Sequence, residues 1–511
     1  MHGRDSLEDN NHVYITKVNE VYLKIKCERH ISQELHEHFS FMVPGHQFVP
    51  AFRNKIWNGK IYLFHLQTNQ IYIGLIKYLQ EFCESRDYTI GYSQDSAHLD
   101  IEDDFSVYHA KKFADNLQLS SRGKKIEIRD HQVDAFCHAM QTRRALLLSP
   151  TASGKSLIIY LLVRQFMDYQ YLKGLIIVPT TSLVEQLYSD FGDYAGDTDF
   201  KNHEHVHRIY QGKDKVTNKA VTISTWQSLY QMPKEYFEQF DYVIGDEAHL
   251  FKAQSLTSIL TACTNAKYRI GLTGTLDGTK THKLVLEGLF GSTKRVITTK
   301  ELIDKNELSK FEIKCLILKH PDEICLEMKD KDYQEEIQYL IANEQRNKFI
   351  KNLAVSLGNN TLILYQMVAK HGQILYDMIK NTEKIGERKV FFISGKTETD
   401  DRESIRKIME TENDAIVVAS FGTFSTGINI RNLHNIIFAS PSKSRVRNLQ
   451  SIGRGLRQNE GKEMATLYDI ADDLRYKKHM NFTLKHFTDR IKIYTEEKFP
   501  FKLYKINIKK S

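Results

Sequence analysis

The sequence feature that most constrains the fold is a loop of small residues between an apolar run and a helical pattern. Apolar residues 145–148 precede it, residues 157–166 follow it as a helix, and the loop itself reads Ser149-Pro150-Thr151-Ala152-Ser153-Gly154-Lys155-Ser156. A strand, a loop ending in Gly-Lys-Ser and a helix form a cradle in which backbone N–H groups and a helix N-terminus face a phosphate. Lys155 adds a positive charge, and Ser156 offers a hydroxyl to Mg²⁺. Ser149 replaces the usual first glycine, so an ordinary strand-to-helix turn is the alternative for this segment alone.

Two series of strand and helix patterns follow one another. The strand candidates of the first series, within residues 116–300, are Arg144–Leu148, Leu175–Val178, Ala220–Ser224, Tyr242–Ile244 and Tyr268–Leu272. Those of the second, within residues 310–475, are Phe311–Leu318, Thr361–Tyr365, Lys389–Ile393, Ala415–Ala419, Asn435–Ala439 and Ala465–Ile470. Strands that alternate with helices are typical of parallel sheets. The pattern therefore predicts an α/β protein with two successive lobes that face a cleft.

The segment before the first series predicts a small α+β domain. Residues 1–12 are polar and predict a disordered start, whereas residues 13–105 contain alternating apolar residues, two helical patterns and an Asn58-Gly59 hairpin signal. Aromatic residues there lie among basic ones, a mixture suited to phosphate contact and base stacking. The candidates for DNA contact are Arg53, Lys55, Trp57 and Lys60. A packed aromatic core is the alternative for Trp57.

The end of the chain is basic and aromatic. Residues 476–511 hold ten Lys and Arg against three Asp and Glu, with Phe and Tyr between them. We predict a helix over 482–496 that packs by its aromatic face, followed by a tail. Its lysines either follow phosphates or form a solvated charged face.

Composition limits the class of protein. The formal net charge of +7 permits nucleic-acid binding without requiring it. No apolar run approaches the ~18 residues of a membrane span, so we expect no membrane partner. The six cysteines form no CxxC pair, which argues against zinc and disulfides and favours a reducing cytoplasm.

A pair of carboxylates gives the first lobe its chemistry. Asp246-Glu247-Ala248-His249 follows the apolar strand 242–244 directly. A carboxylate at the carboxyl end of a parallel strand lies near the phosphate loop. We expect Asp246 to hold Mg²⁺ with Ser156, and Glu247 to polarise the attacking water.

These motifs, taken in order, resemble those of superfamily 2 helicases, which implies two tandem RecA-like lobes that bind and hydrolyse ATP. Segment 128–132 resembles the adenine-sensing motif and assigns Arg129 and Gln132 to the nucleotide. Segments 175–183 and 224–229 resemble two motifs that hold the DNA backbone, with Pro179, Thr180, Thr181, Thr225 and Trp226 as contacts. Packing against a helix start is the alternative for Trp226. Segment 272–275 resembles the motif that couples hydrolysis to DNA, through Thr273, Thr275 and His249.

The second lobe completes the motif series. Segment 450–457 matches QxxGRxxR, which implies catalytic roles for Gln450, Arg454 and Arg457; the two arginines share a helix face and act as arginine fingers. Segment 420–429 resembles the motif that touches both DNA and nucleotide. It assigns Thr423 and Thr426 to DNA and Gly427 and Asn429 to the nucleotide. Ser394 and Gly395 resemble a further DNA-facing strand end.

The two ends of the chain are similar to those of the UvsW family of tailed-phage DNA helicases. The similarity rests on Phe39-Ser40-Phe41, Pro50-Ala51-Phe52-Arg53 and Trp57-Asn58-Gly59-Lys60-Ile61, and on residues of the segment 485–499. It implies a motor on branched or forked DNA that regresses forks, migrates Holliday junctions and unwinds R-loops, which are RNA–DNA hybrids, in recombination, repair and replication. It also implies a monomer in the host cytoplasm, with single-stranded-DNA-binding or recombination proteins as partners.

Two other classes stay open. One is an RNA-directed helicase, because Asp-Glu-Ala-His is common among such enzymes. The other is a translocase that moves on duplex DNA without unwinding it. Too little chain follows Arg457 for the accessory domains of the RNA enzymes, and no nuclease or recognition domain is visible for a restriction motor.

Overall fold

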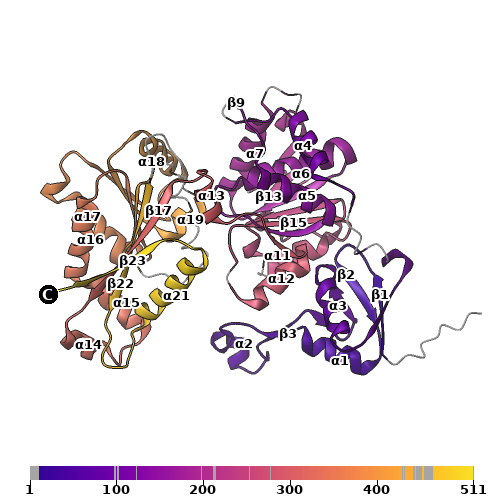
Figure 1. The fold of residues 1–511 in the computed structure, drawn as a ribbon, viewed down its shortest axis with the longest axis horizontal. Helices are drawn as coiled ribbons and strands as arrows, with labels where there is room; N and C mark the ends of the chain where they lie inside the picture. The colour runs from indigo at the N-terminus through magenta and orange to yellow at the C-terminus, as the bar shows by residue number, and fades with distance from the viewer. Residues whose placement is uncertain are drawn as a thin grey trace, which may run out of the picture. The chain divides into compact units, whose positions relative to one another are not determined.

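The computed structural model describes residues 11–96, 99, 103–121, 123–196, 198, 200–210, 214–251, 254–276, 278–427, 430, 432–440, 444, 452–453 and 464–509. The chain divides into two compact units (Figure 1). The first unit comprises residues 1–149 and 154–296, and the second comprises residues 150–153 and 297–511.

A small sheet begins the first unit. Its order is β5-β6-β2-β1-β7, with strands β1 (His12–Lys17), β2 (Tyr22–Lys26), β5 (Phe64–His65), β6 (Gln70–Tyr72) and β7 (Thr89–Tyr92). The antiparallel pair β1–β2 confirms the alternation seen in the sequence, because Val13, Ile15, Leu23 and Ile25 all point into the core. Helices α1 (Arg29–His38) and α3 (Ile76–Glu84) accompany this sheet.

The prediction of a tight hairpin turn at Asn58-Gly59 is wrong. Strand β3 (Ser40–Met42) pairs with β4 (Lys60–Tyr62), but residues 43–59 join them and include the short helix α2 (Pro50–Arg53). Gly59 has a φ of 80°, so it provides the left-handed residue that leads into β4. We call residues 40–62 the arm.

A parallel sheet forms the body of the first unit. Among the described residues it has seven strands in the order β12-β13-β11-β14-β15-β10-β16. Their bounds are β10 (Arg144–Leu148), β11 (Gly174–Val178), β12 (Val206–Ile209), β13 (Val221–Thr225), β14 (Tyr242–Asp246), β15 (Tyr268–Thr273) and β16 (Thr293–Arg295). The helices are α4 (Val107–Asn116), α5 (Asp130–Thr142), α6 (Lys155–Gln170), α7 (Thr181–Ala195), α8 (Asn202–His205), α9 (Trp226–Leu229), α10 (Lys234–Phe237), α11 (Gln254–Ala262) and α12 (Lys280–Phe290).

The small sheet and the parallel sheet share one hydrophobic core. A single cluster of buried side chains runs from β1, β2 and α3 to β10, β14 and α12. Gly74 lies so close to α12 that an added Cβ would be 1.9 Å from the Glu287 carbonyl oxygen. The hydroxyl of Tyr78 donates to the Glu287 carboxylate at 2.6 Å, and Arg144 pairs with Glu20 at 2.7 Å. The N-terminal sheet is therefore packed onto the parallel sheet by both apolar and polar contacts.

The second unit contains another parallel sheet of seven strands within the described residues, in the order β19-β20-β18-β21-β22-β17-β23. The strands are β17 (Lys310–Lys319), β18 (Thr361–Tyr365), β19 (Lys389–Ile393), β20 (Ala415–Ser420), β21 (Asn435–Phe438), β22 (Met464–Asp473) and β23 (Phe501–Asn507). The helices are α13 (Thr299–Asp304), α14 (Asp322–Met328), α15 (Tyr333–Ala342), α16 (Glu344–Ser356), α17 (Gln373–Lys380), α18 (Thr399–Thr411), α19 (Phe421–Gly427) and α21 (Phe482–Glu496). The two sheets confirm the prediction of two tandem RecA-like lobes.

The C-terminal segment contains the predicted helix and one further element. Helix α21 has the predicted bounds, and the buried pair of Arg490 and Asp469, 2.8 Å apart, fixes it to β22. The residues after it form β23, which the sequence did not reveal and which adds an edge strand parallel to β17. Among the residues that the structure describes, no helix is both long and apolar enough to cross a bilayer.

Candidate active site

The motifs of the first unit meet at one edge of its sheet. The phosphate loop follows β10, the Asp246-Glu247 pair closes β14, and Thr273 closes β15, which lies between them. The backbone N–H of Ser149 donates to the Thr273 carbonyl at 2.8 Å and joins two of these strand ends. Carboxyl ends of parallel strands are where such sheets bind their ligands.

The phosphate loop has the backbone that its sequence predicts. Gly154 has a φ of 87° and Ala152 a φ of 69°, so the chain turns sharply before α6 begins at Lys155. The Ser153 hydroxyl donates to the Pro150 carbonyl at 2.6 Å, and Lys155 Nζ donates to the Ser149 carbonyl at 3.3 Å. The free N–H groups and partial positive charge at the start of α6 suit this loop to a phosphate.

Ser156 meets a residue that sequence reasoning missed. Its hydroxyl lies 2.7 Å from the hydroxyl of Tyr194 on α7. One hydroxyl from Ser156 and one carboxylate from Asp246 fit Mg²⁺, which keeps waters and phosphate oxygens as its other ligands. Among the described residues no group of three His, Cys, Asp or Glu side chains forms a separate metal site. Tyr194 is 38 positions away in the sequence, and no local pattern links it to the loop.

The Asp246-Glu247 pair has unusual electrostatics and an unusual backbone. Burial raises the pKa of Asp246 to about 6, and the neighbouring Glu247 adds to this shift while Lys155 opposes it. Glu247 has a φ of 52°, a left-handed conformation that is uncommon for a side chain of this type. Strained residues of this kind occur frequently at active sites.

His249 connects the carboxylate pair to the next strand end. Its Nδ1 lies 2.9 Å from the Thr273 hydroxyl and 3.3 Å from the Glu247 carboxylate. The Thr273 hydroxyl in turn donates to the Thr275 carbonyl at 3.0 Å. The structure thus brings together all three residues that the sequence assigned to coupling. It also adds His282 of α12, whose Nε2 lies 2.9 Å from the His249 carbonyl.

Gln132 lies against the phosphate loop. Its Oε1 accepts from the Arg129 backbone N–H at 3.0 Å, and an added Cβ on Gly154 would be 2.1 Å from its Nε2. Gln132 is buried, whereas the Arg129 side chain is exposed at the start of α5. The segment assigned to the nucleotide base is therefore next to the segment assigned to its phosphates.

The DNA-contact candidates of the first unit form two groups. Pro179, Thr180 and Thr181 follow β11, whereas Thr225 ends the neighbouring strand β13 and Trp226 follows it. A hydrogen bond of 3.5 Å from Gln227 to the Pro179 carbonyl joins them. Thr225 is buried, and Trp226 is half-buried and packs against the hydrophobic core.

The second group lies on the arm. Arg53, Lys55 and Lys60 are exposed, and Arg53 Nε donates to the Gln47 carbonyl at 3.1 Å. Trp57 is half-buried, and its indole N–H donates to the Lys60 carbonyl at 2.7 Å. The indole thus holds the arm together as well as lying beside its basic residues.

The candidates of the second unit follow strands β19 and β20, which are neighbours. Ser394 is buried, Gly395 is exposed, and the Thr423 hydroxyl lies 2.8 Å from that of Ser420. Thr426 and Gly427 belong to the end of α19. The other candidates of this unit, namely Asn429, Gln450, Arg454 and Arg457, lie outside the described residues.

Three family profiles match the chain. "DNA helicase UvsW, N-terminal" matches residues 13–93, "Type III restriction enzyme, res subunit" matches residues 125–278, and "Helicase conserved C-terminal domain" matches residues 344–459. With the two parallel sheets and the motif-bearing edge, they define an ATP-dependent helicase motor.

Comparison with individual proteins gives the family. The ATP-dependent DNA helicase uvsW of Enterobacteria phage T4 is 34% identical over 505 residues, which cover 95% of this chain and 98% of the phage protein. The crystal structure of T4 UvsW aligns with a TM-score of 0.51 and 32% identity, over 97% of this chain and 99% of that one. The restriction-modification enzyme LlaBIII bound to DNA aligns with a TM-score of 0.55 and 16% identity, over 75% of this chain and 31% of that one, and supports the fold alone. The chain belongs to the UvsW family of ATP-dependent DNA helicases.

Proposed function

We propose that this DNA helicase acts on branched DNA: that it regresses forks, migrates Holliday junctions and unwinds R-loops, and that it does so in the cytoplasm of an infected host cell. The observation that carries the proposal is the arm, a basic and apolar projection on a domain that shares its core with the motor. A branch differs from plain duplex in its junction, so a motor that prefers branches needs a fixed element beside its motor domain to meet it.

The arm has the composition of an element that enters a DNA junction. Phe48 is 69% exposed and Ile56 is 80% exposed, and Lys55 lies next to Ile56. Apolar side chains that insert between base steps unstack them, and neighbouring cations hold the phosphates. Phe48 and Ile56 lie on the same short segment as Arg53 and Lys55, so apolar and basic side chains occur together on the arm.

We assign the chemistry of ATP hydrolysis to both units. Ser156 and Asp246 would hold Mg²⁺, Lys155 would hold the phosphates, and Glu247 would orient the attacking water. Gln450, Arg454 and Arg457 would complete the set from the QxxGRxxR segment, with the arginines offsetting charge in the transition state. His249, Thr273 and Thr275 would relay the state of the nucleotide to the DNA-contact segments.

The test compares four substrates side by side: a fork, a Holliday junction, an R-loop and a plain duplex, each with ATP and Mg²⁺. We expect faster unwinding of the three branched substrates. Equal rates on all four would overturn the proposal. Stimulation of ATPase by single-stranded RNA but not by forked DNA would indicate an RNA helicase, and displacement of bound protein without strand separation would indicate a translocase.

Charge reversal on the arm tests the proposed branch contact. Lys55→Glu with Lys60→Glu should slow fork unwinding about tenfold or more while ATPase stimulated by single-stranded DNA changes little. The matched control is Lys24→Glu with Lys26→Glu, two exposed lysines on β2 of the same domain. Equal effects of the two pairs would remove the arm as the branch contact.

A further inference from the structure

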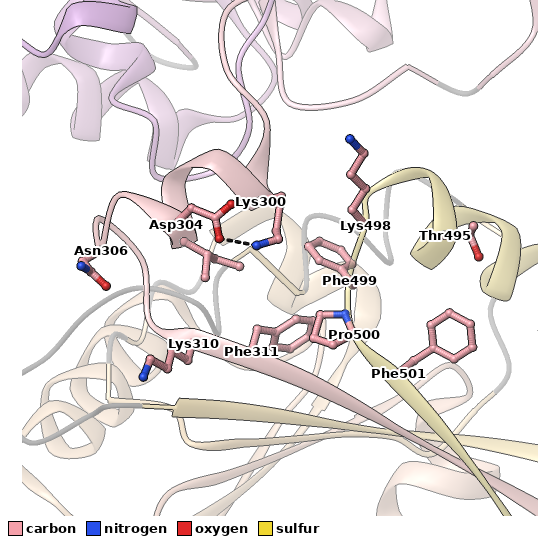
Figure 2. Close-up of a pocket in the computed structure, with 11 residues that line it drawn as sticks. Lys300, Asp304, Asn306, Lys310, Phe311, Thr495, Lys498, Phe499, Pro500 and Phe501 are labelled. Carbon is pink, nitrogen blue, oxygen red and sulfur yellow. Dashed lines mark hydrogen bonds and ion pairs between the residues drawn. The ribbon is translucent and has the colours of Figure 1, made fainter.

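A pocket of about 790 Å³ lies in the second unit, between α13 and the C-terminal segment (Figure 2). Its floor is apolar and is formed by Phe311, at the start of β17, and by Phe499 and Pro500, which precede β23. The rings of Phe311 and Phe499 meet edge to face, with centroids 5.3 Å apart. Phe501 is half-exposed at the side. The volume lies within the usual range of small-ligand sites.

The rim of the pocket is positively charged. Lys300, Lys310 and Lys498 all line it, and Lys300 forms an ion pair with Asp304. The ammonium groups of Lys310 and Lys498 are exposed, and within the described part of the chain no carboxylate lies within ion-pair distance of either. Two cations therefore remain available above an apolar and aromatic floor.

The backbone presents one of these cations in a strained conformation. Lys498 has a φ of 57° just beyond the end of α21, a position where glycine is usual. Asn306, which also lines the pocket, has a φ of 55° beyond the end of α13. A lysine at the end of a helix also offsets the partial negative charge there. A role at the helix end would explain Lys498 but not the aromatic floor of the pocket or the second lysine, Lys310.

The pocket is separate from the edge that carries the helicase motifs. It lies where β17 begins at Lys310 and β23 begins at Phe501. The motif residues of the same sheet, Ser394 and Thr423, follow the carboxyl ends of β19 and β20. All these strands are parallel, so the pocket and the motifs lie at opposite edges of one sheet.

We propose that this pocket binds one nucleotide of single-stranded DNA. The base lies against the exposed Pro500 and the half-exposed Phe501, above the buried ring of Phe499, and Lys310 and Lys498 hold the flanking phosphates. Aromatic surface with lysines beside it is the combination that single-stranded nucleic acid prefers. The choice of DNA over other nucleic acid rests on the proposed function. The bound strand is a second segment of DNA, apart from the segment on the motif edge.

Photocross-linking of the full chain tests this site directly. An oligothymidylate that carries 5-iodouracil should cross-link to the peptide that contains Phe499 and Phe501, as mapped by mass spectrometry. Lys310→Glu with Lys498→Glu should abolish that cross-link, lower affinity for the oligonucleotide about tenfold, and reduce the slope of log affinity against log salt by about 1.4. Lys502→Glu with Lys505→Glu, on exposed positions of β23, should leave the cross-link in place.

A single variant separates binding from folding. Lys498→Gly removes the charge and also relieves the left-handed backbone, so thermal stability should hold or rise while the cross-link weakens.

Several outcomes would overturn the proposal. The first is the absence of a cross-link at the pocket in the wild type, and the second is an unchanged salt slope in the double variant. The third is competition in which free ATP or an acidic peptide displaces the oligonucleotide from the pocket at a lower concentration than oligothymidylate does. The last result would identify a free-nucleotide or protein-docking pocket. If the wild-type protein unwound branched and plain substrates at equal rates, the proposed function would be overturned while the cross-link at the pocket remained. The two failures are therefore distinguishable.

Discussion

At the scale of single residues, Glu247 is the side chain that we propose as the base that activates water. Its backbone is left-handed and its carboxylate lies 3.3 Å from His249. Glu247→Gln keeps the shape and hydrogen-bonding capacity of the side chain but removes its basicity. We expect ATP binding to persist and turnover to fall by several orders of magnitude.

The measurement is kcat for DNA-stimulated ATP hydrolysis, alongside ATP affinity. Glu235→Gln, an exposed position on α10, is the matched control and should hydrolyse ATP like the wild type. If Glu247→Gln retains turnover, the base must be another group.

His371 gives the second unit a stability that depends on pH. Burial lowers the pKa of His371 to about 3, and the nearby Arg346 guanidinium lowers it further while Asp472 opposes the shift. The native state thus stays unprotonated where the unfolded state, with an ordinary pKa near 6.5, takes up a proton. Stability from this residue is full above pH 6.5 and is lost as the pH falls towards 3. We expect a loss of about 2 kcal/mol between pH 6 and pH 4.

Urea unfolding at a series of pH values measures how the free energy of unfolding changes with pH. Hydrogen exchange of β18 and β21 then shows whether the change lies in the second unit. His371→Gln should flatten this pH dependence, even if the variant is less stable at pH 7. His203→Gln provides the control, because the His203 side chain is 74% exposed. If the pH dependence of the free energy of unfolding persisted in His371→Gln, groups other than His371 would be its cause.

The residues that the sequence revealed are those whose partners lie in the same short segment. Lys155, Asp246 and Glu247 belong to local patterns that encode strand, loop and charge together. Tyr194 and His282 could not be found this way, because their contacts with Ser156 and His249 join positions 38 and 33 residues apart. A tyrosine near the end of one helix and a histidine near the start of another are ordinary in a sequence.

At the scale of elements, α12 is in contact with both the active site and the N-terminal domain. Its first turn holds His282 against the His249 carbonyl, and its last turns hold Glu287 and Gly288 against Tyr78 and Tyr72. A shift of the N-terminal sheet would therefore act on a helix that supports the Asp246-Glu247 turn. This contact depends on close approach, and Gly74 provides it.

Gly74→Ala tests that approach. An added Cβ would be 1.9 Å from the Glu287 carbonyl oxygen, and neither backbone can yield without moving α12. We expect the free energy of unfolding of the first unit to fall by more than about 2 kcal/mol. Gly358→Ala is the control, since its Cβ would meet nothing within 4 Å. If the two variants were equally stable in urea unfolding, the contact between Gly74 and the Glu287 backbone would accommodate a methyl group at little cost in free energy.

Helices and strands could be predicted from the sequence where their buried apolar residues recur at a regular spacing. Helix α21 was found with its bounds because its aromatic residues recur at helical spacing, and Phe487, Ile493 and Tyr494 are buried. Strand β23 was missed because most of its residues are exposed, as on an edge strand, so that no alternation marks it. The segment that joins β3 to β4 was misread because its Asn-Gly pair leads into a strand without forming a two-residue turn.

At the scale of the whole molecule, composition suggests a boundary near residue 105, whereas the hydrophobic core continues across it. Leu75 and Leu79 of the N-terminal domain belong to the same buried cluster as Leu146, Val243 and Phe290 of the parallel sheet. No pattern within either segment could reveal the shared core, because a buried leucine produces the same apolar pattern whether its own domain or a neighbouring domain covers it. The consequence is that the N-terminal domain stabilises the motor as well as extending it.

Removal of residues 1–105 tests this consequence. The truncated chain would expose the face of α12 that the N-terminal domain covers, together with the Glu287 carboxylate that Tyr78 satisfies. We expect the first unit to lose more than about 10 °C in Tm and to aggregate on heating. Hydrogen exchange should quicken in β14 and β15 and stay unchanged in β18, β20 and β21 of the second unit.

Removal of residues 1–10 alone is the control and should leave exchange in both units unaltered. If the longer deletion also left β14 and β15 protected, the shared cluster would contribute little to stability. Loss of fork unwinding in that deletion could then be attributed to lost DNA contact. If protection is lost instead, the arm has to be tested by the exposed substitutions Lys55→Glu and Lys60→Glu, because only they alter the proposed branch contact without opening the core on which the active site rests.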